Sequence, residues 1–268
     1  MKTLYRVCID DTCDAGRKDF ICAGALMGKV EGWSTFNKEW RKALRAEPAI
    51  GYWHGKDLPT LRGPFLQFRN KQLFPLPTGM DAAVSKRTAL QKVIEESALA
   101  GFGVGVLISD YERIRESHPR AKTFMAKDAF EYILQELVYR TSTGILAGDQ
   151  DAKIAFISDL SGRSKVYELV YNKWKMSNPK TAKSMLAITH DDDKTHYGLQ
   201  GADMIASVVN RIYRAHLKDG IIPEEYPLSS VMWRIGRIDE KYLLTMLGHQ
   251  SVRPVEQALS TPSTGQIS

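Results

Sequence analysis

The stretch Thr3-Leu-Tyr-Arg-Val-Cys-Ile-Asp10 decides the fold class, because its apolar side chains alternate with the period of two that is typical of a β-strand. This strand ends on two neighbouring carboxylates, Asp10 and Asp11. A second apolar run at residues 20–27 follows closely enough to return beside the first strand as an antiparallel neighbour. We therefore predict an antiparallel hairpin at the N-terminus.

The rest of the chain predicts helices that alternate with short strands. The expected helices lie at 33–44, 84–100, 123–146, 163–177, 198–217 and 240–247, and the expected strands at 103–109, 153–158 and 185–189. Prolines and glycines indicate a loop-rich excursion at about 45–83. Together with the hairpin, this order favours an α/β fold, a mixed sheet with helices on both faces, in which ligand sites lie off the strand ends.

Length and composition are those of an ordinary globular protein. The 268 residues are 43% hydrophobic and 25% charged, which is enough for one sizeable core. We expect a single domain over residues 1–248 and a flexible C-terminal tail over 249–268. No run approaches the ~18 to 20 apolar residues of a membrane span, and Arg6 interrupts the apolar start, so we expect a cytoplasmic protein without membrane contact. The sequence does not specify an oligomeric state.

A formal net charge of +6 favours an anionic partner such as nucleic acid. The expected helix at 163–177 interleaves basic residues with aromatic rings that could stack on bases, which are Arg163, Lys165, Lys173 and Lys175 with Tyr167, Tyr171 and Trp174. The same pattern is typical of an amphipathic helix with a solvated basic face, so both interpretations stay open.

Aspartates follow the predicted strands. Asp10, Asp110, Asp159 and Asp191 each end an apolar run, where a carboxylate can face a shared crevice or cap the next helix. Asp203 differs because helical spacing places it among small residues at the edge of an apolar stripe. A charge so close to the core needs a basic partner or a bound cation.

These carboxylates suit a hard divalent cation, because Mg²⁺ prefers oxygen ligands and needs few protein groups. We expect Asp10, Asp159 and Asp203 to bind the ion, with Asp11 as a further candidate ligand. Two such ions could activate water for phosphodiester hydrolysis. His54 could transfer a proton or add a ligand, or it could be a hydrogen-bonded loop side chain.

The remaining motifs are an acidic run and a glycine-rich segment, and the motifs of several common enzyme classes are absent from the sequence. The acidic run 191–193 fits a solvated turn or a peripheral cation site. The glycines of Gly101-Phe-Gly-Val-Gly105 precede a strand and do not open a helix, so they do not form a phosphate loop. The sequence has no Walker lysine motif, no Gly-x-Ser-x-Gly elbow and no zinc-protease histidine pair.

Four segments resemble the domain of unknown function 3800 family. Ile9-Asp10-Asp11-Thr12 resembles its opening Ile-Asp-Glu-Ser, and Leu199-Gln200-Gly201-Ala202-Asp203 resembles its closing Leu-Gln-x-Ala-Asp. His54 resembles the central histidine of the family, and Phe156-Ile157-Ser158-Asp159 resembles its strand with a terminal aspartate. The similarity keeps the same order over roughly residues 5 to 215.

The resemblance implies a ribonuclease H-like fold, in which acidic residues from the first strand, a later strand and a final helix bind catalytic Mg²⁺ or Mn²⁺. Asp10, Asp159 and Asp203 match those three places. Family members occur in bacteria, phages and mobile elements, some beside defence genes, which implies a prokaryotic setting. The chain departs from the family at Asp11-Thr12-Cys13, where Glu-Ser-Gly is usual, and at Tyr52, where a glutamate is common.

We therefore predict a metal-dependent, nuclease-like hydrolase that acts on a phosphodiester and holds nucleic acid through basic helical faces. The alternative is a non-catalytic binding or interaction protein, in which the same carboxylates cap helices and pair with arginines. A third reading, hydrolysis of a small nucleotide, requires residues 48–80 to close the crevice to long polymers. The sequence does not distinguish DNA, RNA and nucleotide substrates.

Overall fold

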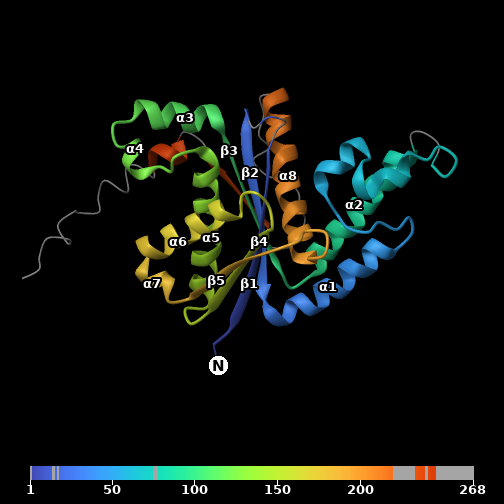
Figure 1. The fold of residues 1–268 in the computed structure, drawn as a ribbon, viewed down its shortest axis with the longest axis horizontal. Helices are drawn as coiled ribbons and strands as arrows, with labels where there is room; N and C mark the ends of the chain where they lie inside the picture. Colours follow the sequence, from blue (N-terminus) through green and yellow to red (C-terminus); the bar gives the residue numbers. More distant parts are fainter. Residues whose placement is uncertain are drawn as a thin grey trace, which may run out of the picture.

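The residues described in a computed structural model of the chain are 2–13, 16, 18–74, 78–219, 233–238 and 241–245. They form a six-stranded sheet in the order β5-β4-β1-β2-β3-β6 (Figure 1). The strands are β1 (Leu4–Cys13), β2 (Phe20–Lys29), β3 (Ala100–Leu107), β4 (Lys153–Asp159), β5 (Met185–Asp191) and β6 (Trp233–Ile238). β1, β2 and β3 pair antiparallel, β4 and β5 run parallel to β1, and β6 runs parallel to β3. The predicted mixed sheet with its N-terminal hairpin is confirmed.

Helices cover both faces of the sheet (Figure 1). They are α1 (Val30–Arg45), α2 (Thr78–Glu96), α3 (Ile108–Ser117), α4 (Ala121–Phe124), α5 (Ala129–Gly148), α6 (Ser164–Ser177), α7 (Pro179–Ala182) and α8 (Tyr197–Asp219), with the 3₁₀ helices η1 (Gly55–Thr60) and η2 (Gly63–Arg69). α5 and α6 share one apolar cluster with the sheet, and α8, α1 and α2 share another on the opposite face. The sheet therefore separates two cores.

The alternation of β1 assigns its side chains to these two cores. Val7 and Ile9 lie in the cluster with α5 and α6, whereas Cys8 lies in the cluster with α8 and α1. Successive strand residues point to opposite faces. The adjacent aspartates at the end of β1 therefore point to different sides of the sheet.

Glycines in β2 and β3 let α8 lie directly on the sheet. A Cβ at Gly24 would come within 2.5 Å of the carbonyl oxygen of Ala202 and the amide nitrogen of Ala206. Added Cβ atoms at Gly103 and Gly105 would collide with side chains of the same helix. Residues 101–105 lie within β3, in agreement with the expectation that these glycines do not form a phosphate loop. Close approach of the helix backbone fixes the height of α8 above β1 and β2.

The expected excursion contains more order than its prolines and glycines indicate. η1 and η2 pack their apolar side chains inward, with the rings of Trp53 and Phe65 at 5.6 Å and those of Phe65 and Phe68 at 6.1 Å. α2 begins at Thr78, inside the predicted excursion and earlier than the predicted start at residue 84. Tertiary packing therefore organises a segment whose local sequence favours loops.

Several elements differ from the sequence-based prediction. The expected helix at 123–146 is two helices, because the Asp128 side chain accepts the N–H of Glu131 at 2.8 Å and starts α5 afresh. α3 and β6 were not predicted. Residues 241–245 of the expected helix at 240–247 are helical, and the expected tail at 249–268 lies outside the described residues. No helix in the described part of the chain is both long and apolar enough to cross a membrane.

Candidate metal centre

Asp10 and Asp11 end up in different surroundings because they point to opposite faces of the sheet. Asp11 forms an ion pair with Arg163 and accepts a hydrogen bond from the Tyr167 hydroxyl at 2.7 Å on the α6 side. Asp10 has the same orientation as Cys8 and so faces α8. Its Oδ1 accepts a hydrogen bond from the backbone N–H of Asp11 at 2.8 Å. The structure thus supplies Asp11 with a cationic partner and directs Asp10 towards a different helix.

Asp203 is carried to this face of β1 by α8. Its residue is 6% exposed, and its Oδ2 accepts the backbone N–H of Gly55 at 2.6 Å. A Cβ at Gly55 would collide with Ser207, so only glycine allows this backbone to approach the helix. Asp203 is therefore held between the helix and the start of η1.

Asp159 reaches the same edge of the sheet from β4. The parallel pairing of β1 with β4 places Ile9 beside Ser158, one residue before Asp10 and Asp159. Ile157 packs against the α8 side of the sheet, and Asp159 follows it by two residues. Strand register therefore brings these two carboxylates to neighbouring positions on one face.

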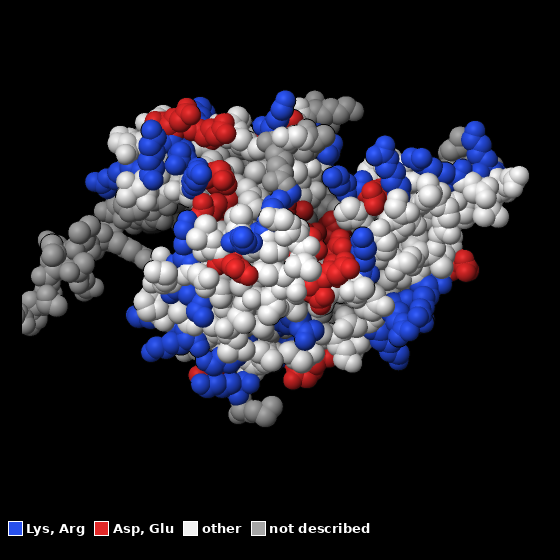
Figure 2. Space-filling view, in the orientation of Figure 1, with Lys and Arg blue, Asp and Glu red and all other residues white. Residues whose placement is uncertain are grey.

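Asp193 is a fourth carboxylate of this group that the sequence did not single out. It lies in the turn between β5 and α8, its charge raises the pKa of Asp203, and the charge of Asp159 raises its own pKa. The sequence offered only the acidic run 191–193, in which Asp192 serves the turn by accepting the N–H of Lys194 at 2.9 Å. Acidic side chains gather near the middle of this face of the molecule, where the chain enters α8 (Figures 1 and 2).

The side chain of Gln200 connects the segments around Asp203. Its Oε1 accepts hydrogen bonds from the Trp40 indole at 2.9 Å and from the Trp53 backbone N–H at 3.1 Å. Its Nε2 donates to the carbonyls of Asp193 at 2.9 Å and Lys194 at 3.2 Å. Gln200 is fully buried. It therefore fixes α1, the start of the excursion and the turn before α8 relative to one another.

The carboxylates of this group raise one another's pKa values. Burial, and then the charges of Asp203, Asp11 and Asp159, raise the pKa of Asp10 well above its ordinary value, against the lowering effect of the Asp11 backbone N–H. Burial and the Asp193 charge raise the pKa of Asp203 to about 6, against the lowering effects of the Gly55 N–H and His54. Burial also raises the pKa values of Asp159 and Asp193, and each of these is raised further by neighbouring carboxylates. Negative charge is concentrated here without full compensation.

His54 lies beside the same carboxylates. Its Nδ1 is 2.9 Å from the Oδ2 of Asp57, three residues further on. Burial lowers the pKa of His54, but the hydrogen bond with Asp57 and the charges of Asp203, Asp57 and Asp193 raise it above its ordinary value. The imidazole is held by one nitrogen and is about one-third exposed. The other nitrogen remains to exchange a proton with a ligand.

The chemistry of the group fits a divalent cation better than its present geometry does. Its donors are carboxylate oxygens, and the leading causes of the Asp10 pKa shift among the described residues include carboxylate charges and no lysine or arginine. The buried indole N–H of Trp53 has no hydrogen-bond partner, although it lies close enough to lower the pKa of Asp203. The indole N–H is therefore directed at the Asp203 carboxylate. As placed, however, no three acidic, histidine or cysteine side chains among the described residues converge enough to hold a metal ion.

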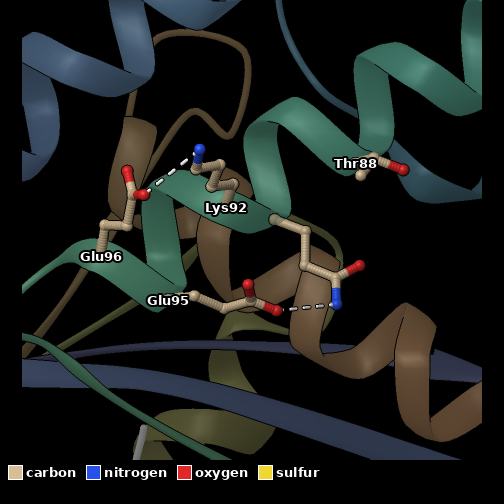
Figure 3. A pocket seen from close by; sticks show the side chains of 5 residues that line it. Thr88, Lys92, Glu95 and Glu96 are labelled. Carbon is tan, nitrogen blue, oxygen red and sulfur yellow. Dashed lines mark hydrogen bonds and ion pairs between the residues drawn. The ribbon is translucent and has the colours of Figure 1, made fainter. Parts of the chain in front are cut away.

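Other candidates lie elsewhere. Asp110 is in the first turn of α3 and pairs with Arg113 at 3.0 Å. A pocket lined by α2 side chains has its polar groups paired along the helix, Lys92 with Glu96 at 3.4 Å and Gln91 with Glu95 at 3.2 Å (Figure 3). Neither place gathers the predicted site residues.

The basic helix α6 uses much of its charge and aromatic surface within the protein. Lys173 pairs with Glu131, as Arg163 pairs with Asp11. The rings of the helix are buried or packed, with Trp174 at 5.1 Å from Tyr139. This arrangement favours the amphipathic-helix interpretation over a stacking surface for bases.

Comparisons with known proteins give similarity of fold alone. No family model and no curated protein matches the chain. Similar solved structures include a chain of the PCNA:RNase HII complex from Archaeoglobus fulgidus, with 13% identity, a TM-score of 0.36 and coverage of 98% of this chain and 97% of that one. Bst-RNase HIII in complex with Mn²⁺ has 11% identity and a TM-score of 0.40, and a mutant of Bst-RNase HIII has 12% and 0.37. Both matches cover 82% of this chain and 57% of the Bst-RNase HIII chain.

Proposed function

We propose that the chain is a divalent-metal-dependent hydrolase of phosphodiester bonds, with Asp10, Asp159 and Asp203 as ligands of Mg²⁺ or Mn²⁺. The observation that carries the proposal is that strand register brings Asp10 and Asp159 to neighbouring positions on the face of the sheet that α8 covers, where the charges of Asp203 and Asp159 raise the pKa of Asp10. Crowded carboxylates are tolerated where a cation can offset their charge. The carboxylates would have to turn towards one another to bind it.

The structure changes the proposed ligand set in two respects. We add Asp193 to the set because its charge raises the pKa of Asp203 and the charge of Asp159 raises its own pKa. Asp11 leaves it because Arg163 and Tyr167 already occupy its carboxylate. When bound, a divalent cation in such a set lowers the pKa of water and stabilises a leaving phosphate oxygen.

His54 is the proposed proton-transfer group. The hydrogen bond with Asp57 orients the His54 ring. The raised pKa of His54 lies closer to physiological pH, where the imidazole can both accept and release a proton. A histidine in this state can take a proton from water or give one to a leaving group. Its position beside Asp203 puts that exchange next to the carboxylates.

The motifs that resemble the domain of unknown function 3800 family support the same proposal. Membership of that family would place the protein in a prokaryotic phage-defence or mobile-element setting. We further propose that the protein acts in the cytoplasm and that residues 1–248 form a single domain. Nucleic acid is the proposed substrate.

A non-catalytic binding protein is the second candidate. The observation that favours it is the lack of a ready metal-binding group among the described residues. In that case the carboxylates would serve only as hydrogen-bond acceptors, as Asp203 does for Gly55.

Calorimetric titration with Mn²⁺ separates the two functions. We expect the wild-type protein to bind Mn²⁺, Asp10→Asn and Asp203→Asn to lose that binding, and Asp110→Asn to retain it, because Asp110 pairs with Arg113 in α3. Cleavage of end-labelled RNA and DNA in Mn²⁺ should follow the same pattern. A wild-type protein that takes up no Mn²⁺ and cleaves neither polymer would overturn the proposal and leave the binding function.

A further inference from the structure

The segment from Gly55 to Phe74, which we call the basic arm, concentrates positive charge beside the carboxylates. It contains four cations and a single acidic residue, Asp57, which pairs with His54. The cations are all exposed and are Lys56, Arg62, Arg69 and Lys71. The Arg69 side chain donates to the carbonyl of Thr60, whereas the side chains of the other three form no hydrogen bond or ion pair in the part of the chain that the structure describes.

The basic arm is a packed element, so these charges have fixed positions. Leu58, Leu61, Phe65 and Phe68 are buried in the core shared with α1 and α2. Leu58 and Leu61, and likewise Phe65 and Phe68, are three residues apart, as one turn of a 3₁₀ helix requires, and the cations between and after them are exposed. Basic side chains lie along the upper edge of this part of the molecule (Figure 2).

The arm is also physically joined to the candidate site. Gly55, its first residue, donates its N–H to Asp203, and η1 packs on α8. Lys56 is the next residue. The first cation of the basic arm therefore lies one residue from the backbone N–H that binds Asp203, and the other three follow it within the same packed segment.

A polyanion needs such an arrangement to reach an acidic site. Carboxylates repel phosphates, and nearby lysines and arginines offset that repulsion by binding the flanking phosphates and releasing counterions. Exposed Leu66 and Leu73 add apolar surface within the same segment. A small anionic substrate would gain little from cations spread over two 3₁₀ helices, whereas a chain of phosphates would contact several.

We propose that the basic arm binds the phosphodiester backbone of a nucleic-acid strand and positions it across the carboxylates. This rests on the proposed function, which it deepens by assigning the substrate as a polymer and the binding surface as η1 and η2. It also moves the binding surface away from α6, where Lys173 pairs with Glu131 and Trp174 packs against Tyr139.

Fluorescence anisotropy with labelled 20-mers in EDTA tests the arm separately from any metal or catalysis. The test variant is Lys56→Ala/Arg62→Ala/Lys71→Ala, which removes the three unpaired cations. The matched control is Lys38→Ala/Arg41→Ala/Arg45→Ala on the exposed face of α1, which removes the same charge. The three probes are single-stranded RNA, single-stranded DNA and a DNA duplex. The probe that binds most tightly identifies the class of polymer.

For a single strand, each lost phosphate contact should reduce the slope of log K against log salt by about 0.7, so three lost contacts reduce it by about 2. The corresponding loss of affinity is about 100-fold at 0.1 M salt. We expect this loss for the arm variant, a much smaller loss for the α1 variant, and near wild-type binding for Lys56→Arg/Arg62→Lys/Lys71→Arg, which also checks folding.

Equal losses in the arm and α1 variants, or no loss in the arm variant, would overturn the proposal, as would a wild-type protein that binds none of the three probes. The outcome is independent of the proposed catalysis. Binding that depends on the basic arm, without Mn²⁺ uptake, would support the binding surface and reject the proposed hydrolase. Mn²⁺-dependent cleavage that the arm variant does not affect would support the hydrolase and reject the binding surface.

Discussion

Replacing Asp203 by Asn should make the metal-free protein more stable. Asp203 is 6% exposed, and burial together with the Asp193 charge raises its pKa from 3.8 to about 6. At about 1.4 kcal/mol for each tenfold change in proton affinity, keeping the carboxylate ionised at neutral pH costs the fold about 3 kcal/mol. Asn removes the charge but keeps an oxygen that can accept the Gly55 N–H.

The sign of the effect follows from the direction of the pKa change. A carboxyl group whose pKa is raised by folding stabilises the protein fully below its unfolded value of 3.8, and this contribution is lost as the pH rises towards the folded value of about 6. At pH 7.5 wild-type Asp203 therefore bears the whole cost. We expect Asp203→Asn to gain up to about 3 kcal/mol in EDTA at pH 7.5, and less than about 1 kcal/mol near pH 4.

Urea denaturation followed by circular dichroism measures this difference. Added Mn²⁺ should raise the stability of the wild type and leave the Asn variant unchanged, since only the wild type keeps the ligand. Asp110→Asn, in the exposed pair with Arg113, should change stability by less than about 1 kcal/mol. A variant at Asp203 that is less stable than the wild type in EDTA at pH 7.5 would show an ordinary structural carboxylate and refute the reasoning.

Three further predictions concern the surroundings of the site. Gln200→Ala should cost about 2 to 4 kcal/mol in urea denaturation because four buried hydrogen bonds are lost, whereas Gln91→Ala on α2 should cost less than about 1 kcal/mol. Because protons compete with the metal for Asp203, whose pKa is about 6, calorimetry should show weaker Mn²⁺ binding at pH 5.5 than at pH 7.5, and equal affinity would contradict this. Gly24→Ala should lower the melting temperature, since its Cβ would lie 2.5 Å from the α8 backbone, while Gly144→Ala, which meets no atom within 4 Å in a helix, should raise it slightly.

Strong local patterns predicted the elements that hold the site. The alternation of the first strand and the apolar spacing around Asp203 gave β1 and α8 within a few residues of their observed bounds. α3 was missed because its sequence continues directly from β3, without a loop of glycine or proline to separate them. β6 was missed because residues 233–238 mix basic and apolar residues and obtain their strand partner from distant β3. Pairing with a distant strand leaves little trace in local sequence.

The site was predictable in outline but not in membership. The sequence placed Asp10 and Asp159 at strand ends, and the structure brings those ends together through the β1–β4 register. It could not indicate Asp193, because the approach of that turn depends on the amide of Gln200, seven residues away along the chain. The sequence could not exclude Asp11 as a metal ligand either, because Arg163, the ion-pair partner of Asp11, lies on another element. Contacts between elements decide such cases.

Asp10 and Asp11 point to opposite faces of β1, so the surroundings of each depend on the register of the strand. Inserting or deleting one residue between Leu4 and Ile9 would exchange the faces of every later side chain. Asp11 would then face α8 and Asp10 would face Arg163, while apolar residues would change cores. Natural variants of this protein should therefore tolerate length changes in the turn after β1 far better than within the strand that precedes it.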